Sequence, residues 1–329
     1  MMRVPSWLAD PRARVLVLLA VLIALAPLLF PSGYYYRVGT LVFLNALTVT
    51  GLVILTGYAG QVSLGHAGFF GIGAYACAVG TSHFGLAPGL CVALGAGLAG
   101  GLALAVGRPI LRLKSHYLAV ATLGLGILIA MVLTNEGQWT GGPDGMSAPT
   151  LPLRAWLRAW GVPLSPAQAW YALSGLVLLA GAWMALSLRE SASGRALRAL
   201  HDSEVAARVI GIDVARAKGR AFAISAVYAS VAGSLMALFN GFVNPAMAGF
   251  MHSIELVTMV VLGGAGSVLG GVVGATVLTV LPQTLTVFQE YEMTMLGLIM
   301  MVMMIFLRQG VVPGLVGAWT AWRGRRARP

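Results

Sequence analysis

Charged residues are scarce in this chain. Asp, Glu, Lys and Arg together make up 9% of the 329 residues, while hydrophobic residues make up 58%. A soluble globular domain carries about 25% charged residues. So few charges cannot cover a water-exposed surface, and most of this surface must therefore face lipid. The composition predicts an integral membrane protein.

Residues typical of catalytic and metal sites are also few. Both cysteines, Cys77 and Cys91, lie in apolar stretches, which indicates small buried hydrophobes rather than a metal site or a disulfide framework. The five histidines are scattered without an HExxH pair, and no GxxxxGK[ST] phosphate loop occurs. We therefore expect a non-catalytic chain with no metal site, no cofactor and no ATP of its own.

Runs without charge mark the predicted membrane spans. Crossing the hydrocarbon takes about 20 helical residues, and a central charge costs about 2.5–3.5 kcal/mol. The longest charge-free run extends from residue 38 to residue 107. We predict an all-α integral membrane protein, a polytopic bundle of about 8–10 transmembrane helices, some of them short or broken. The spans are expected near residues 15–32, 38–57, 67–83, 87–107, 116–134, 169–188, 220–241, 252–263, 267–282 and 291–307.

Basic residues set the expected orientation. If the N-terminus is cytoplasmic, all but three of the 21 Lys and Arg residues fall inside, the exceptions being Arg37, Arg154 and Arg158. Retention of positive residues in the cytoplasm is the usual bias in membrane proteins. The net charge of +11 then reflects topology, not nucleic-acid binding. This division treats 1–329 as a single transmembrane domain with an external loop at 135–168, a cytoplasmic segment at 189–219 and a cytoplasmic tail at 308–329.

The N-terminus allows a second interpretation. Arg12 and Arg14 precede an apolar run that resembles a signal peptide. A retained first span is favoured because the charge distribution above works with it in place.

One pair of predicted spans is too short. Residues 252–282 must cross the membrane an even number of times, but at 1.5 Å per residue they extend only about 46 Å, less than two spans of about 30 Å. At least one of the two helices should be short or broken, and the pair either spans the membrane or is re-entrant. Broken helices are tolerated inside a membrane only where protein packs around them or where they line a cavity.

A glycine-rich segment, TGYAGQVSLGHAGFFGIGAY at 56–75, lies in the longest charge-free run. Its backbone and the side chains of Gln61, Ser63 and His66 either hydrogen-bond a polar solute in transit or form a tight turn between packed helices. Gly57 and a later echo of the pattern, Gly263 and Gly264 in GGAGSVLG at 263–270, are further candidates for a translocation path.

Apart from Glu292 at the start of the span at 291–307, Glu255 is the only acidic residue inside a predicted span. An intramembrane carboxylate indicates function by default. It either lines the path or lies near a span end, paired with His252 or with a backbone group.

The segment 189–220 combines charge with a helical apolar pattern. Leu197, Leu200, Ala207 and Ile210 recur at helical spacing among seven basic and four acidic residues. Ser193 and Gly211 are plausible start and stop signals for one amphipathic helix outside the membrane. Ala206 and Ala207 would then form a small-residue patch for a partner. The alternative is a solvated basic loop, which explains the arginines but not the apolar stripe.

At these residues the sequence resembles the LivM-type inner-membrane permease of branched-chain amino acid ABC importers. The matching stretches run in order from about residue 40 to residue 315 and are specific when taken together. They are GYAGQVSLGHAGFFGIGAY at 57–75, LRLKSHYLAVATLG at 111–124, TGGPDG at 140–145, GRALRALHDSEVAARVIGI at 194–212, SIE at 253–255 and VLGGAGS at 261–267. His201, where a charged Arg or Glu is commoner, and Arg308, which lacks the usual following Pro, depart from the pattern.

The resemblance implies a permease domain in a bacterial inner membrane, with both termini cytoplasmic. It also implies a second, homologous permease subunit, two cytoplasmic ATPase subunits that carry the ATP and Mg, and a periplasmic or surface-tethered solute-binding protein. The ATPase-coupling residues it implies lie in the 194–212 stretch: Gly194, Arg195, Leu197, Glu204, Ala206, Ala207, Gly211 and Ile212.

The expected solutes are branched-chain amino acids or related small polar molecules, moved by ATP-driven alternating access. The same scaffold could instead serve urea, short amides or aromatic acids. A stand-alone channel or ion-coupled carrier is less favoured because such a carrier usually shows more paired intramembrane ionisable groups. A membrane enzyme is less favoured still, because no convergent acid, base or metal set occurs.

Overall fold

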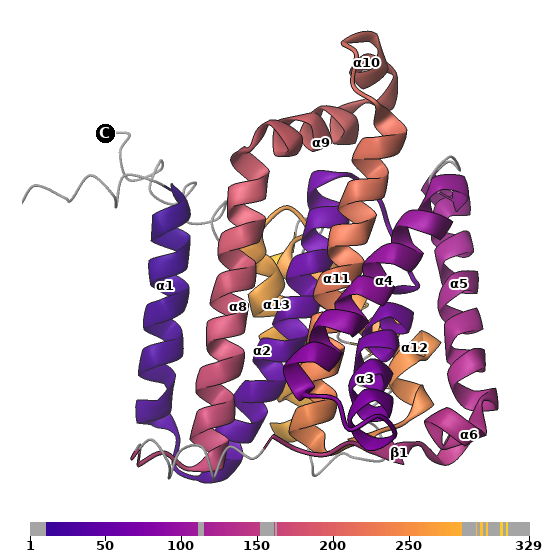
Figure 1. Cartoon of the computed structure of the whole chain (residues 1–329). Helices are drawn as coiled ribbons and strands as arrows, with labels where there is room; N and C mark the ends of the chain where they lie inside the picture. Colours follow the sequence, from indigo (N-terminus) through magenta and orange to yellow (C-terminus); the bar gives the residue numbers. More distant parts are fainter. Residues whose placement is uncertain are drawn as a thin grey trace, which may run out of the picture.

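The computed structural model describes residues 11–110, 115–151, 161 and 163–284, and beyond them only the isolated positions 294, 297, 298, 301, 310, 311 and 314. The described chain is almost entirely helical (Figure 1). In Figure 1 the helices run between two ends of a bundle. We call the upper one the α9 end and the lower one the β1 end. The elements are α1 (Pro11–Leu25), η2 (Ala26–Leu29), α2 (Gly33–Val53), η3 (Ile54–Tyr58), α3 (His66–Ser82), α4 (Pro88–Ile110), α5 (Ser115–Asn135), α6 (Gly137–Thr140), η4 (Gly142–Asp144), β1 (Met146–Ser147), α8 (Pro166–Glu190), α9 (Ala192–Asp202), α10 (Glu204–Val209), α11 (Val214–Asn240), β2 (Phe242–Val243), η5 (Pro245–Ala248), α12 (Phe250–Gly263) and α13 (Val268–Thr284).

These helices confirm the all-α polytopic membrane fold. Within the described residues, six helices are long and apolar enough to cross a membrane, and α12 and α13 form a further pair of shorter apolar helices. Each predicted span up to 267–282 coincides with a helix. The predicted span at 291–307 and the tail at 308–329 lie outside the described residues, apart from the isolated positions above.

The prediction of short helices in 252–282 is confirmed. α12 has 14 residues and α13 has 17, which correspond to about 21 and 26 Å, less than the hydrocarbon thickness of about 30 Å. They meet at a turn in which Gly264 takes a φ of +106°. Side chains disfavour this conformation, whereas glycine adopts it readily.

α2 and α11 form the centre of the bundle. In their most apolar spanning stretches, 83% and 72% of the residues are buried, whereas in that of α1 only 6% are buried. Small residues let α11 approach α3 closely: a Cβ added at Gly73 would lie 1.9 Å from the Ser230 carbonyl oxygen, and one added at Gly233 would lie 1.9 Å from that of Phe70. Membrane helices associate by this kind of backbone approach, since lipid tails leave little hydrophobic drive between them.

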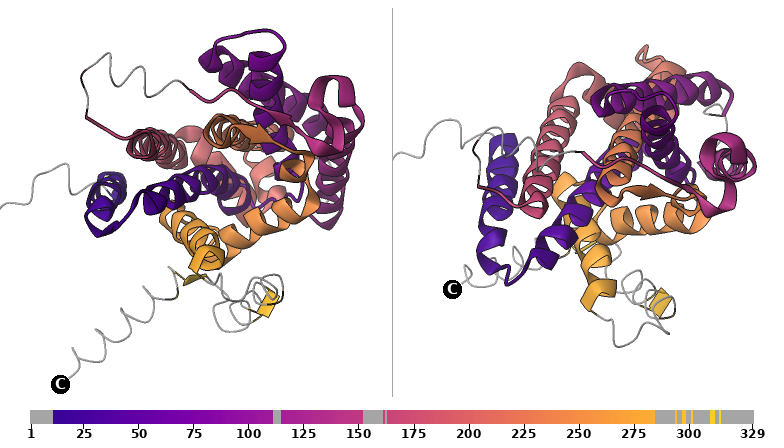
Figure 2. Two further views of the ribbon diagram at one scale, coloured as in Figure 1. Left: turned by 90° about the horizontal axis from the view of Figure 1, so that it is seen from below. Right: turned by 60° about the horizontal axis from the view of Figure 1, so that its bottom comes forward.

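α1 lies at the rim of the bundle, as the view from below shows (Figure 2, left). Its two ends are fastened to α8. Arg12 forms an ion pair with Glu190 at the α9 end, and the Tyr171 hydroxyl donates to the Ile23 carbonyl oxygen over 2.9 Å toward the other end. α1 is therefore held to the bundle through α8.

The predicted loop at 135–168 closes the β1 end. Its described part contains α6, η4 and β1, and β1 pairs with β2 in antiparallel register, Met146 with Val243 and Ser147 with Phe242. This pairing fastens the loop after α5 to the connection that leads from α11 into α12. Residues 152–160 of the loop lie outside the described residues.

The prediction of one amphipathic helix from Ser193 to Gly211 is wrong. The segment forms two helices, α9 and α10, separated at Ser203. Ser191, not Ser193, caps α9 by accepting a hydrogen bond from the Gly194 amide, and Ser203 caps α10 by accepting one from the Ala206 amide. A serine side chain that caps a helix start replaces the missing backbone acceptors there, so Ser203 favours a restart rather than a continuous helix.

Candidate functional site

The glycine-rich segment breaks a helix inside the bundle. α2 ends in the π-helical turn η3, and the chain then runs without helix from residue 59 to residue 65 before α3 begins. Gly60 takes a φ of +66° at the break. The Gln61 amide donates to the Leu55 carbonyl oxygen over 3.0 Å, and the Leu64 amide donates to Thr122 Oγ1 over 3.1 Å. These bonds supply the partners that a non-helical backbone needs within a membrane protein.

The three polar side chains predicted for the path are all buried. His66 lies between two serines: its Nδ1 is 2.8 Å from Ser63 Oγ, and its Nε2 is 2.7 Å from Ser225 Oγ on α11. Ser63 and His66 therefore join the break to α11. The Gln61 side-chain amide differs, because neither its nitrogen nor its oxygen finds a hydrogen-bond partner in the described structure.

The two glycine-rich segments that resemble each other in sequence also meet in space. A Cβ added at Gly57 would lie 1.9 Å from the Ala265 carbonyl oxygen, which brings the two segments together. Within the second segment, a Cβ added at Gly263 would lie 1.8 Å from the Gly270 carbonyl oxygen. We call this contact, formed by Gly57, Gly263, Gly264 and Ala265, the glycine junction. It fastens the end of α2 to the turn between α12 and α13.

The helix break also touches α9, a contact that sequence reasoning missed. A Cβ added at Gly60 would lie 2.8 Å from His201 Nδ1, and the Arg189 guanidinium lies 5.9 Å from the centre of the Tyr58 ring. A cation over an aromatic face within about 6 Å is attracted to it. The α9 end of the bundle is thereby joined directly to the 59–65 segment.

Three of the predicted coupling residues seat α9 on the bundle. Gly194 and Leu197 are buried, and a Cβ at Gly194 would lie 2.1 Å from the Leu188 carbonyl oxygen. Arg195 Nη1 donates to the Glu190 carbonyl oxygen over 2.9 Å. These residues hold the segment in place, and the structure gives them internal partners.

Helix α10 projects beyond the α9 end of the bundle (Figure 1). Glu204 in its first turn pairs with Lys218 of α11 and, at 3.9 Å, with Arg208. Ala207 is fully buried, so the expected docking patch of Ala206 and Ala207 is wrong for Ala207. Of the remaining predicted coupling residues, Ala206 and Gly211 are exposed and Ile212 is partly buried.

The outward side of α10 carries aliphatic residues instead. Val205, Val209 and Ile210 are 73%, 82% and 70% exposed. The expectation that Ile210 shares the inward stripe of Leu197 and Leu200 is wrong, because the break at Ser203 resets the helical phase. The spacing of Val205 and Val209, four residues apart, was the available signal for this exposed face.

Glu255 lies on the outer side of α12. It pairs with His252, whose Nδ1 is 3.1 Å from the Glu255 carboxylate, and its side chain is 46% exposed. The structure thus shows the pairing with His252 that was one of the two expectations for Glu255.

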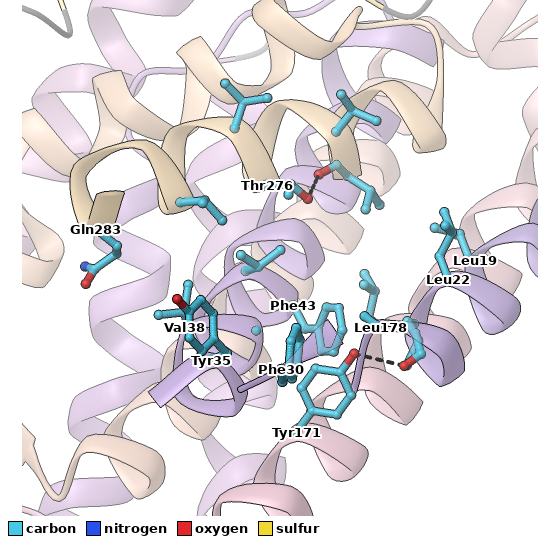
Figure 3. A pocket seen from close by; sticks show the side chains of 18 of the residues that line it. Leu19, Leu22, Phe30, Tyr35, Val38, Phe43, Tyr171, Leu178, Thr276 and Gln283 are labelled. Atoms are coloured by element: carbon cyan, nitrogen blue, oxygen red, sulfur yellow. Dashed lines mark hydrogen bonds between the residues drawn. The ribbon is translucent and has the colours of Figure 1, made fainter. Parts of the chain in front are cut away.

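One apolar groove on the described surface lies elsewhere. It has a volume of about 820 Å³ and is lined by residues of α1, α2, α8 and α13. Its wall is almost wholly apolar (Figure 3), with the Tyr34 hydroxyl donating to Gln283 Oε1 over 2.7 Å at one end. None of the predicted path residues lines it. Such a wall suits lipid chains and lacks partners for the charges of a small polar solute.

Comparison with known families decides what this bundle is. Residues 34–307 match the model of the family described as branched-chain amino acid transport system / permease component. The chain belongs to this permease family. It is accordingly a multi-pass protein of the inner membrane, and its helix break, glycine junction and α9–α10 segment are features of a transport permease.

Individual relatives agree with the family match. The chain is 34% identical over 316 residues to the high-affinity branched-chain amino acid transport system permease protein LivM of Escherichia coli K12, covering 91% of this permease and 74% of the relative. It is 28% identical over 253 residues to LivH of Salmonella typhimurium, covering 71% and 79%. It is 29% identical over 288 residues to the ribose import permease protein RbsC of Escherichia coli K12, covering 83% and 84%. No solved structure matches the chain.

Proposed function

We propose that this chain is the permease subunit of an ATP-binding-cassette importer and that it moves branched-chain amino acids across the inner membrane by alternating access. The choice of solute is supported by the relative named LivM, which is more similar and covers more of this chain than the ribose permease does. In this proposal the chain itself is non-catalytic, and ATP with Mg is bound by separate ATPase subunits.

The observation that carries the proposal is the exposed apolar side of α10. Val205, Val209 and Ile210 are exposed on and just after α10, the helix that projects beyond the α9 end (Figure 1). Two exposed arginines, Arg208 at 69% and Arg216 at 79%, lie in the same part of the chain. Apolar side chains grouped on a projecting helix mark a protein contact. A helix laid by its apolar side into a groove is a recurrent mode of recognition, and we assign an ATPase subunit as the partner.

The contacts behind α10 supply a route from that partner to the membrane. Glu204 and Lys218 tie α10 to α11, and His201 of α9 lies against Gly60 in the helix break. A displacement of α10 and α9 therefore reaches the 59–65 segment without passing along a whole helix. Such coupling requires that the ATPase bind α10 with different affinity in its two states.

The assembly we propose contains a second homologous permease, two ATPase subunits and a solute-binding protein on the opposite side. The α9 end, the N-terminus and the C-terminus then face the cytoplasm. The lysine and arginine distribution supports this orientation, because Arg189, Arg195, Arg198 and the other basic residues of 189–220 lie at the α9 end.

Replacing Val205 and Val209 by serine tests the proposal. The wild-type permease is coexpressed with the second permease and the ATPase subunits and reconstituted into proteoliposomes with the solute-binding protein outside. It should copurify with the ATPases, and the proteoliposomes should take up leucine only with ATP inside. The double variant should keep its membrane fold and lose at least about tenfold in ATPase affinity and uptake. The matched control is Ala215→Ser, an exposed position in the first turn of α11, which should behave as wild type. Normal uptake by the double variant would refute the docking surface.

A further inference from the structure

Glu255 is an exposed carboxylate within the membrane-spanning part of the bundle. Two contacts set its depth. The His252 ring lies 5.0 Å from that of Phe70, and Gly71 packs against Ala248 just before α12. Phe70 lies about three helical turns, about 18 Å along the axis of α3, from Ser82, and Ser82 donates to the Ser147 carbonyl oxygen at the β1 end. α12 thus begins well inside the bundle and not at its border.

Lipid is a poor neighbour for this side chain. A carboxylate that faces the bilayer centre costs about 2.5–3.5 kcal/mol, and intramembrane acids almost always face a protein interior or a water-filled cavity. His252 contacts one carboxylate oxygen, but nearly half of the side chain remains uncovered in the described structure. Since the face that carries Glu255 does not suit lipid, it must border either an aqueous path or another subunit.

The residues around Glu255 are apolar. Met251 and Val261 are exposed on the same side of α12, and Ile254 between them is partly exposed. We call this set of four residues the Glu255 stripe. It presents one negative charge on an otherwise aliphatic surface. An ammonium group beside a branched alkyl chain is the chemistry that complements such a surface, since ammonium and carboxylate form strong charge-assisted hydrogen bonds.

We propose that the Glu255 stripe lines the translocation path and that the Glu255 carboxylate binds the α-ammonium group of the amino acid in transit, while Met251 and Ile254 contact its alkyl side chain. His252 holds the carboxylate when no solute is present. This assignment rests on the proposed function, because it takes the solute to be an amino acid. A cation of the second permease subunit is the competing occupant, and the experiments below separate the two.

Transport by charge variants is the first test. In the reconstituted complex, Glu255→Gln should lower kcat/KM for leucine uptake by about tenfold or more, while Glu255→Asp should recover part of the loss. Assembly of the complex and its ATP hydrolysis without solute should stay unchanged. The control is Glu136→Gln, an exposed acid between α5 and α6. Uptake by Glu255→Gln at the wild-type rate overturns the proposal, and so does failure of this variant to assemble, which would assign the carboxylate to a subunit contact.

Accessibility of an introduced thiol is the second test. Both native cysteines are fully buried, so the background of labelling is low. A cationic, water-soluble methanethiosulfonate reagent should modify Glu255→Cys in at least one of the nucleotide-free and ATP-trapped states, and leucine should slow the reaction. Leu98→Cys, at a 63% exposed position on the apolar helix α4, should stay unmodified because we expect this position to face lipid. Lack of modification at position 255 in both states would overturn the path assignment.

The two levels of inference fail separately. If wild-type proteoliposomes show no ATP-dependent leucine uptake, the proposed function is wrong, whatever the labelling shows. If they do show it and position 255 is inert to both charge substitution and labelling, only the role of the Glu255 stripe is wrong.

Discussion

The glycine junction and helix α10 are the two regions in which signature residues gather, and their surroundings are opposite. At the junction, Gly57 and Gly263 have backbone oxygens within 2 Å of where a Cβ would lie. On α10, Val205 and Val209 stand largely in the open. The junction is thus built for close packing inside this chain, whereas α10 is built for contact with another. Motif residues in the two regions are therefore constrained for different reasons: those of the junction by folding, and those of α10 by a partner.

The largest effect is expected from a methyl group at the junction. Gly57→Ala places its Cβ against the Ala265 carbonyl oxygen, a backbone atom that cannot rotate away, and should cost about 3 kcal/mol or more of stability. Thermal unfolding of the purified permease in detergent measures this. Gly97→Ala on α4 is the control, because a Cβ there meets no described atom within 4 Å. Equal melting temperatures for the two variants would show that the junction is not tightly packed.

A smaller effect is expected at two neighbouring alanines of α10 that the sequence does not distinguish, one facing the bundle and one facing away. Ala207 is buried behind α10 and its neighbour Ala206 is exposed. Ala207→Leu should overpack the contact between α10 and the bundle, at a cost of about 1–3 kcal/mol, and should expose the 192–212 segment to limited proteolysis. Ala206→Leu should leave the cleavage pattern unchanged. If Ala206→Leu were cleaved more readily than Ala207→Leu, Ala206 and not Ala207 would face the bundle.

The smallest effect is expected at the contact that joins the two regions. His201→Ala removes the ring that lies against Gly60 and leaves the exposed face of α10 intact. It should lower the ratio of leucine transported to ATP hydrolysed by an amount equivalent to about 0.5–2 kcal/mol of coupling, without changing ATPase affinity. His83→Ala serves as the control, because His83 lies at the end of α3 beside Trp139. An unchanged transport ratio for His201→Ala would remove α9 from the coupling route.

Much of the fold was predictable because lipid imposes rules that act locally. Runs without charge located the spanning helices α1 to α5, α8 and α11 to α13. The number of residues available between 252 and 282 predicted that α12 and α13 are short. The predicted helix at 193–211 was wrong because a single cap at Ser203 divides it. Once the helix restarts, residues three or four apart across the break no longer share a face, and for that reason Ile210 was placed inward.

The candidate site was predictable in residue content but not in arrangement. Gln61, Ser63 and His66 were recognised as a polar group. Only the structure shows that His66 bonds to both Ser63 and Ser225, while the Gln61 side chain has no partner among the described residues. Likewise, the predicted coupling residues Gly194 and Leu197 were recognised in the sequence, and only the structure shows that they are buried in α9. Burial depends on neighbours that are distant in sequence.

By itself the sequence determined that this protein is a lipid-embedded helical bundle, where its helices lie and which family motifs it carries, because a hydrocarbon solvent penalises every exposed charge and backbone group residue by residue. Only the tertiary structure decided that the two glycine segments meet, that α9 touches the helix break, that Val209 rather than Ala207 faces outward, and that Glu255 lies on an open face. These are relations between distant residues, and close packing of whole helices sets them.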